Sequence, residues 1–236
     1  MSIRLLTWNL ERKKPTTPTG RSGVEFLFGQ FPDVMVLTEA RTAFPAREGY
    51  TVWSRPMHHR HLGEDERRVV LWSKSPWADV NDVGHDDLPS GRFVSGRTNT
   101  PLGQLTIVGV CIPWHMSNVS AGDRNKRPWE DHLRYLEVLP EVLGSIDGPF
   151  VVAGDFNQRI PRIQGRKDIA EALAACFSGT EIVTTGSIAG VDDPLIDHIA
   201  LGPGLHPDDV WAWRSTQDGV RMSDHSGVGA TVARTE

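Results

Sequence analysis

The stretch Phe150-Val-Val-Ala-Gly-Asp-Phe-Asn157 carries two polar side chains directly after a run of apolar residues. Phe150 to Ala153 is apolar throughout, which favours a buried strand, and Gly154 then brings Asp155 to the strand end. A carboxylate at such an end could orient or deprotonate a water molecule. By the two-residue period of a strand, Asn157 points to the same side and could donate to a developing oxyanion. The alternative is an ordinary Gly-Asp turn.

Two apolar runs near the amino terminus also end in oxygen ligands. The first runs from Ile3 and ends at Asn9, and the second runs from Val34 and ends at Glu39. A carboxylate that ends such a run must be solvated, paired or bound to a cation. Mg²⁺ suits carboxylates and retains several waters for substrate oxygens. The alternatives are a turn at Asn9 and an ion pair between Glu39 and Arg41.

The carboxy-terminal part adds two Asp-His pairs. Asp197 and His198 lie inside the strand-like run 195–201, so alternation points them to opposite faces. Asp197 could orient a histidine and favour its imidazolium form, whereas His198 is interpreted as a structural histidine. Asp224 and His225 precede the last apolar run. Asp224 could complete a metal site and His225 could contact an anion, with a polar loop as the alternative.

Composition favours one soluble domain spanning residues 1–236. Hydrophobic residues make up 39% of the chain and charged residues 23%, which suits a folded core. The net charge of −5 and pI of about 6.0 do not match a protein with a strongly basic surface. Cys111 and Cys176 are expected to be buried free thiols. Neither a signal peptide nor an apolar stretch near ~18 residues is evident, so we expect a cytoplasmic protein without a membrane partner.

The order of apolar runs and turn signals predicts an α/β fold. Ser22 with Glu25 three residues later forms a capping-box pattern for a helix that ends before Pro32. Further helices are expected at 129–146, where Pro140 predicts a kink or two helices end to end, and at 167–177. Further strands are expected at 50–54, 68–73, 78–83, 92–98, 104–112, 181–184 and 210–214. About ten strands with few helices predict two packed sheets with the helices outside.

The ordered set of motifs resembles the endonuclease/exonuclease/phosphatase superfamily, which has the deoxyribonuclease-I-like fold. The resemblance runs from Thr7-Trp8-Asn9 to Ser223-Asp224-His225, essentially the whole chain. It implies a four-layer sandwich in which two mixed β-sheets pack face to face with helices on the outside. It also implies a phosphoesterase that depends on Mg²⁺ or Mn²⁺.

The resemblance further implies a role for each motif residue. The implied metal-site residues are Asn9, Glu39 and Asp224, with Glu39 as the main ligand. The implied catalytic residues are Asp155, Asn157, Asp197 and His225. Asp155 would align the attacking water, and Asn157 would support the phosphoryl oxygens. His225, paired with Asp197, would bind or protonate the phosphate.

One segment, Gly109-Val-Cys-Ile-Pro113, departs from the family pattern. The family normally places a His or Tyr just before the apolar-Pro pair, and here that position is Cys111. A thiol is only a weak donor to a phosphate oxygen. His115, four residues later, is a candidate substitute. Arg159, just after the Asn157 motif, is the third candidate for substrate binding.

Three functions stay open at this stage. The first is in-line attack of water on a phosphate diester, as in a phosphodiesterase or nuclease, with nucleic acid as a candidate substrate. The second is a phosphomonoesterase for a small metabolite, and the third is a non-catalytic binding module. Basic clusters that could meet nucleic acid lie at 124–127, beside Trp129, and at Arg55, Arg60, Arg67 and Arg68, with a solvated surface as the alternative. The sequence leaves the oligomeric state open.

Overall fold

The computed structural model describes residues 1–44, 47–57, 63–119 and 125–235. One six-stranded sheet has the order β11-β14-β1-β2-β4-β3 and a second has the order β5-β6-β7-β8-β10-β9. The first sheet comprises β1 (Ser2–Asn9), β2 (Val34–Arg41), β3 (Tyr50–Trp53), β4 (Glu66–Ser73), β11 (Leu205–Trp213) and β14 (Gly227–Arg234). The second comprises β5 (Trp77–Asn81), β6 (Phe93–Thr100), β7 (Gly103–Cys111), β8 (Phe150–Asp155), β9 (Glu181–Ile182) and β10 (Asp197–Leu201). The helices of the described residues are α1 (Pro18–Gly29), α2 (Glu130–Gly144) and α3 (Lys167–Cys176).

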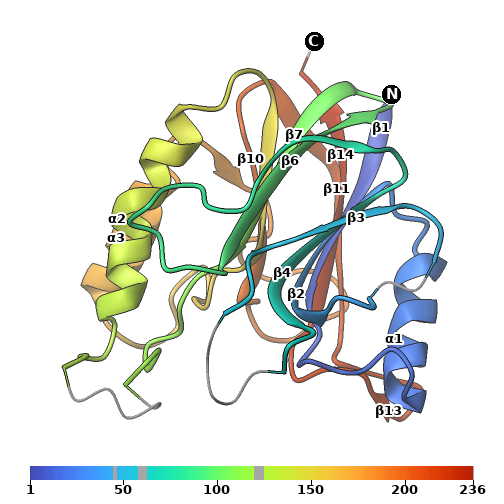
Figure 1. Ribbon diagram of the computed structural model, residues 1–236, viewed down its shortest axis with the longest axis horizontal. Coiled ribbons are helices and arrows are strands. Elements are labelled where there is room, and N and C mark those ends of the chain that lie inside the picture. Colours follow the sequence, from blue (N-terminus) through green and yellow to red (C-terminus); the bar gives the residue numbers. More distant parts are fainter. Residues whose placement is uncertain (45–46, 58–62, 120–124, 236) are drawn as a thin grey trace.

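The two sheets pack face to face, and the helices cover their outer faces (Figure 1). Strand alternation explains the layers. In β1, Ile3 and Leu5 enter the core between the sheets, whereas Leu6 and Trp8 face the cluster that contains α1. On the other side, α2 and α3 pack against the outer face of β7 and β8. The four-layer sandwich expected from the sequence is confirmed.

Gly109 in β7 shows how closely the sheets approach each other. A Cβ atom at this position would lie 2.5 Å from Cγ1 of Val69 and 2.7 Å from Cδ2 of Leu71. Both of these residues belong to β4 of the opposite sheet. The missing side chain therefore allows direct contact between the two layers, as expected for glycine inside a strand.

Some element boundaries differ from the sequence prediction. Helix α1 begins at Pro18 rather than near Ser22, because Thr17 caps it by accepting a hydrogen bond from the Gly20 amide at 3.2 Å. Pro140 lies on the exposed side of a single helix, α2. A short hairpin of β12 (Thr216–Gln217) and β13 (Val220–Arg221) was not predicted, although its Asp-Gly turn is a known hairpin signal.

Candidate active site

Strand ends from both sheets meet at one edge of the sandwich. In the first sheet β1 and β2 are parallel, and Asn9 is paired with Thr38, so Glu39 follows directly beside it. In the second sheet, Asp155 at the end of β8 is paired with Cys111 of β7 and with Asp197 of β10. The topology therefore gathers motif residues that are far apart in the sequence.

Asp155 is held by neighbours from both sheets. The Asn9 amide donates from Nδ2 to Oδ2 of Asp155 at 3.1 Å, and the Asn157 backbone N–H donates to Oδ1 at 2.9 Å. The Asn9 amide is oriented in turn, because its Oδ1 accepts from the Glu11 backbone N–H. Gly154 has φ +139°, and a Cβ there would lie 1.9 Å from the Val110 carbonyl oxygen. The glycine before Asp155 is therefore required by the backbone geometry.

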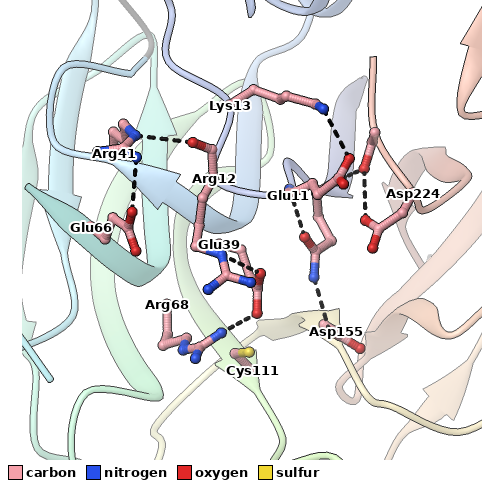
Figure 2. A network of polar contacts seen from close by, with 12 residues as sticks. Glu11, Arg12, Lys13, Glu39, Arg41, Glu66, Arg68, Cys111, Asp155 and Asp224 are labelled. Atoms are coloured by element: carbon pink, nitrogen blue, oxygen red, sulfur yellow. Dashed lines mark hydrogen bonds and ion pairs between the residues drawn. The ribbon is translucent and has the colours of Figure 1, made fainter. Parts of the chain in front are cut away.

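The Asp155 carboxyl carries an unusual charge environment. The side chain is buried, and burial together with the negative charge of Asp197 raises its pKa to about 7. His225 opposes this rise, whereas Glu39 adds to it. Glu39 and Asp155 are thus close enough to interact electrostatically, and Figure 2 shows both in one close view. A nearby cation would lower the pKa of Asp155 and restore its charge.

Asp197 and His225 form a buried pair. His225 Nδ1 lies 2.9 Å from Oδ2 of Asp197. Burial by itself lowers the pKa of His225, but the Asp197 charge and hydrogen bond, with the charges of Asp155 and Asp224, raise it to about 10. His225 is therefore an imidazolium at neutral pH, with Nδ1–H donated to Asp197 and Nε2–H left for another acceptor.

Glu39 lies between two arginines rather than beside the expected one. Its carboxylate pairs with Nε of Arg12 at 3.2 Å and with the Arg68 guanidinium (Figure 2). The ion pair considered as the alternative for Glu39 is thus present, but Arg41 is not its partner, because Arg41 pairs with Asp65 and Glu66. No sequence signal pointed to Arg12, which lies in the loop after β1.

Asn157 and Asp224 lie at the open side of the site. Strand β8 ends at Asp155 and Asn157 has φ +54°, so strand alternation does not place the Asn157 side chain. Its Nδ2 donates to the Ile112 carbonyl at 2.9 Å. Asn157 lines a cavity of about 270 Å³. The exposed Asp224 lines another of about 530 Å³, together with His225.

The three predicted substrate-binding residues have different surroundings. Cys111 is 1% exposed and its thiol pKa is raised to about 12 by burial, which argues against direct contact with a substrate. The His115 ring lies between those of Trp114 and Trp129, with centroids 5.0 and 5.4 Å away, and it lines the 270 Å³ cavity with Asn157. The exposed Arg159 lines both cavities.

Arg92 is a buried cation that sequence reasoning missed. Arg92 is 5% exposed. Its NH1 lies 3.1 Å from the carbonyl oxygen of Cys111 and 3.6 Å from the Sγ of the same residue. Its other terminal nitrogen donates to Oγ of Ser117 at 3.3 Å. Within the described segments no carboxylate pairs with it, and burial lowers its pKa. No pattern in the sequence distinguishes Arg92 from a surface arginine.

The predicted basic clusters are partly neutralised. Arg55 pairs with Asp82 at 3.0 Å, and Lys126 pairs with Glu130 and Asp131. Arg60 and Arg124 lie outside the described residues. Two other expectations are confirmed. Both cysteines are buried free thiols, and His198 is structural, since its ring nitrogens contact Thr184 and the Gln158 carbonyl.

His132 in α2 connects the site loops to the helix. Its Nδ1 lies 2.6 Å from the Pro113 carbonyl, which can only accept, so Nδ1 is protonated and donates. Its Nε2 lies 2.7 Å from Nε2 of Gln158 and therefore accepts. Burial lowers the His132 pKa to about 4 despite the Pro113 bond. The neutral tautomer thus satisfies both neighbours.

We expect His132 to make the protein less stable in mild acid. The unfolded histidine binds a proton near pH 6.5, whereas the folded one does so only near pH 4. Stability present above pH 6.5 should therefore decrease by roughly 1–3 kcal/mol as the pH falls towards 4. Thermal unfolding between pH 4 and 8 should show a weaker acid dependence for His132→Gln. Superimposable pH profiles of the two proteins would contradict the assignment.

The site residues fit a divalent cation. One ligand atom from each of Asp155, Asp197 and His225 lies within 4.8 Å of the others. Oδ1 of Asp197 is buried and, among the residues described, has no hydrogen-bond partner. The wider donor set of carboxylate and amide oxygens is the set that Mg²⁺ and Mn²⁺ prefer. His225 is a poor ligand through Nδ1, because that nitrogen is bonded to Asp197.

Comparisons with known proteins agree with this geometry. The sequence profile of the Endonuclease/Exonuclease/phosphatase family matches residues 6–225. No curated protein matches the sequence significantly. In the part of the chain that the structure describes, no helix is both long and apolar enough to cross a membrane.

Solved structures with the same fold cover nearly the whole chain. An endonuclease/exonuclease/phosphatase from Bacteroides vulgatus is 15% identical with a TM-score of 0.69, covering 100% of both chains. A humanized D. rerio TDP2 is 14% identical with a TM-score of 0.71, covering 98% of this chain and 99% of that one. The 3′-5′ exonuclease NExo from Neisseria meningitidis is 19% identical with a TM-score of 0.67, covering 97% and 98%. The family match, the fold and the convergent site lead to one conclusion: this chain belongs to the endonuclease/exonuclease/phosphatase family.

Proposed function

We propose that the protein is a phosphodiesterase that hydrolyses a P–O bond with the help of Mg²⁺ or Mn²⁺. The observation that carries this proposal is the buried group of Asp155, Asp197 and His225 beside an open cavity of about 530 Å³. Family membership supports phosphoester hydrolysis as the reaction class. A bound cation would be held by Glu39, with Asn9 and Asp224 nearby, and would supply charge neutralisation at a phosphate oxygen.

The chain's own groups fit defined roles in such a reaction. Asp155, oriented by Asn9, is placed to align a water molecule and to accept its proton. His225 is held protonated by Asp197 and can donate Nε2–H to a phosphate oxygen. The Asn157 amide is positioned by the Ile112 carbonyl and retains a second N–H for another oxygen. Positioning and charge stabilisation are the main requirements of phosphoryl transfer.

Room on both sides of the site favours a diester over a monoester. The two cavities adjoin different site residues, His225 in one and Asn157 in the other, and Arg159 lines both. A diester needs space for a group on each side of the phosphorus atom. Two related structures carry DNA: the 3′ phosphatase NExo from Neisseria with a product DNA hairpin, and D. rerio TDP2 with a single-strand DNA product. These precedents make nucleic acid the first substrate to test.

The proposal is tested by comparing a generic diester, bis(p-nitrophenyl) phosphate, with the monoester p-nitrophenyl phosphate and a DNA oligonucleotide. We expect chelation of divalent cations to abolish hydrolysis and added Mg²⁺ or Mn²⁺ to restore it. The diester should be turned over faster than the monoester. Preferential turnover of the monoester would identify a phosphomonoesterase. Failure of every phosphate ester to react in Mg²⁺ or Mn²⁺ would favour a binding module instead.

A further inference from the structure

The 270 Å³ cavity next to Asn157 combines cationic and aromatic side chains. We call it the Arg–Trp groove and define it by His115, Trp129, Asn157, Arg159 and Arg162. It begins at a proposed catalytic residue, because Asn157 is part of its wall. We propose that this groove binds the nucleotide next to the reacting phosphate of a single-stranded nucleic acid. The inference rests on the proposed function and specifies its substrate class.

The charges of the two cavities differ, and they decide which way a polyanion extends. Arg159 and Arg162 are exposed, and neither forms an ion pair within the described segments. Arg162 uses NH1 to donate to the Gly165 carbonyl at 2.7 Å, which fixes the side chain without neutralising it. Arg166 at the same cavity pairs with Asp168 and adds no net charge. The Arg–Trp groove therefore offers two unneutralised guanidinium groups.

The larger cavity on the other side of Arg159 has no excess of positive charge, because its three carboxylates balance Arg159, Arg214 and the protonated His225. Asp192, Asp193 and Asp224 line it, and its second arginine, Arg214, pairs with Asp192 at 2.7 Å. A chain of phosphates would be attracted more strongly into the Arg–Trp groove than into this cavity, since phosphate contacts dominate nucleic-acid affinity. The strand is thus expected to run from the site across Arg159 towards Arg162.

Trp129 provides a fixed aromatic surface in the groove. Its backbone has φ +72°, a left-handed conformation that is uncommon outside glycine, and its N–H donates to the His115 carbonyl at 2.7 Å. Its ring contacts the rings of His115 and His132, with centroids 5.4 and 5.1 Å away. His132 is anchored in turn by Gln158. A ring held in this way loses little freedom when a base stacks on it.

These features favour a single strand over a duplex. Base–aromatic stacking requires an unpaired base, contributes strongly to affinity and tolerates any sequence. Two free arginines give a modest electrostatic contribution, which suits one or two phosphates rather than a long duplex surface. The net charge of −5 agrees with local rather than extended phosphate contacts.

The experiment measures binding of fluorescein-labelled dT6 and U6 by anisotropy, in EDTA and between 50 and 200 mM salt. Trp129→Asn retains a residue that adopts the left-handed backbone, and it should weaken binding by about tenfold or more. Arg162→Gln should reduce the slope of log K against log salt by about 0.7. Arg97→Gln is the matched control, because Arg97 lies on β6 and pairs with Asp79, and it should change neither quantity.

Loss of affinity for either oligonucleotide in Trp129→Asn, with an unchanged thermal unfolding temperature and no loss in Arg97→Gln, would support the Arg–Trp groove as a nucleotide site. Unchanged binding of both oligonucleotides, equal weakening in Arg97→Gln, or tighter binding of a duplex would overturn the inference. The anisotropy measurements of binding do not depend on hydrolysis of the oligonucleotide. A protein that binds as expected but hydrolyses no phosphate ester would therefore refute the proposed function and leave the groove assignment standing.

Discussion

Asp155→Asn is expected to lower diester turnover by about two orders of magnitude or more. The substitution keeps the shape of the side chain but removes the charge that would align and deprotonate a water molecule. The Asn9 amide and the Asn157 N–H each donate to one oxygen of the carboxylate. In the variant, one of these two oxygens is replaced by an amide nitrogen, which cannot accept a hydrogen bond. Steady-state kinetics under saturating Mg²⁺ measure the effect. Asp209→Asn, the same change on the exposed surface of β11, is the matched control.

The same variant should show a characteristic pH dependence of stability in the absence of metal. Because the folded pKa of Asp155 is raised from 3.8 to about 7, the folded state retains a proton that the unfolded state has lost. The wild type therefore loses stability as the pH rises from about 4 to about 7. The difference in Tm between Asp155→Asn and wild type should shift in favour of the variant over this range and level off above it. Near-wild-type turnover, or a Tm difference that does not change with pH, would contradict the assignment.

Asp197→Asn is expected to lower turnover about 10- to 100-fold at neutral pH. An amide oxygen can still accept the hydrogen bond from Nδ1 of His225, but the negative charge that keeps the imidazole protonated is lost. Burial then dominates, and the His225 pKa should fall far below its value of about 10. With the proton on Nδ1, the neutral ring leaves Nε2 unprotonated and unable to donate to a phosphate oxygen.

Two measurements separate this electrostatic effect from misfolding. NMR titration of the His225 ring should give a pKa well below about 10 in Asp197→Asn. Activity of the variant should recover in part as the pH is lowered, because His225 is then protonated again. A His225 pKa that stays near 10, or a loss of activity that is the same at every pH, would show that Asp197 acts in another way.

The sequence predicted most of the fold because its signals are local. Apolar runs such as those leading to Asn9 and Asp155 are short and rich in β-branched or aromatic residues, which favours strand interiors with polar ends. The start of α1 was misplaced because Ser22 and Glu25 form a capping pattern inside a helix that Thr17 already begins. Both Thr17 and Ser22 are possible N-cap residues, and Pro18 at the first helical position favours the earlier start.

The candidate site was predicted less completely, because it depends on contacts between distant segments. Asp197 and His225 are 28 positions apart in the sequence, and Asn9 and Asp155 are 146 positions apart. The family resemblance implied the Asp197–His225 pair, but nothing in the sequence paired Asn9 with Asp155 or placed Arg12 beside Glu39. The residues next to a loop arginine in the sequence do not show whether its side chain faces solvent or a buried carboxylate. Only the packing of the two sheets distinguishes these cases.

We propose that Glu39 holds one divalent cation next to the phosphate, beside Asp155 of the opposite sheet. Anomalous diffraction from a crystal soaked with Mn²⁺ and a phosphate analogue tests it most directly. We predict one strong peak about 2.1 Å from a Glu39 oxygen and adjacent to Asp155, with the analogue facing His225. A peak elsewhere, or a Glu39 carboxylate still paired only with Arg12 and Arg68 under saturating Mn²⁺, would contradict the account.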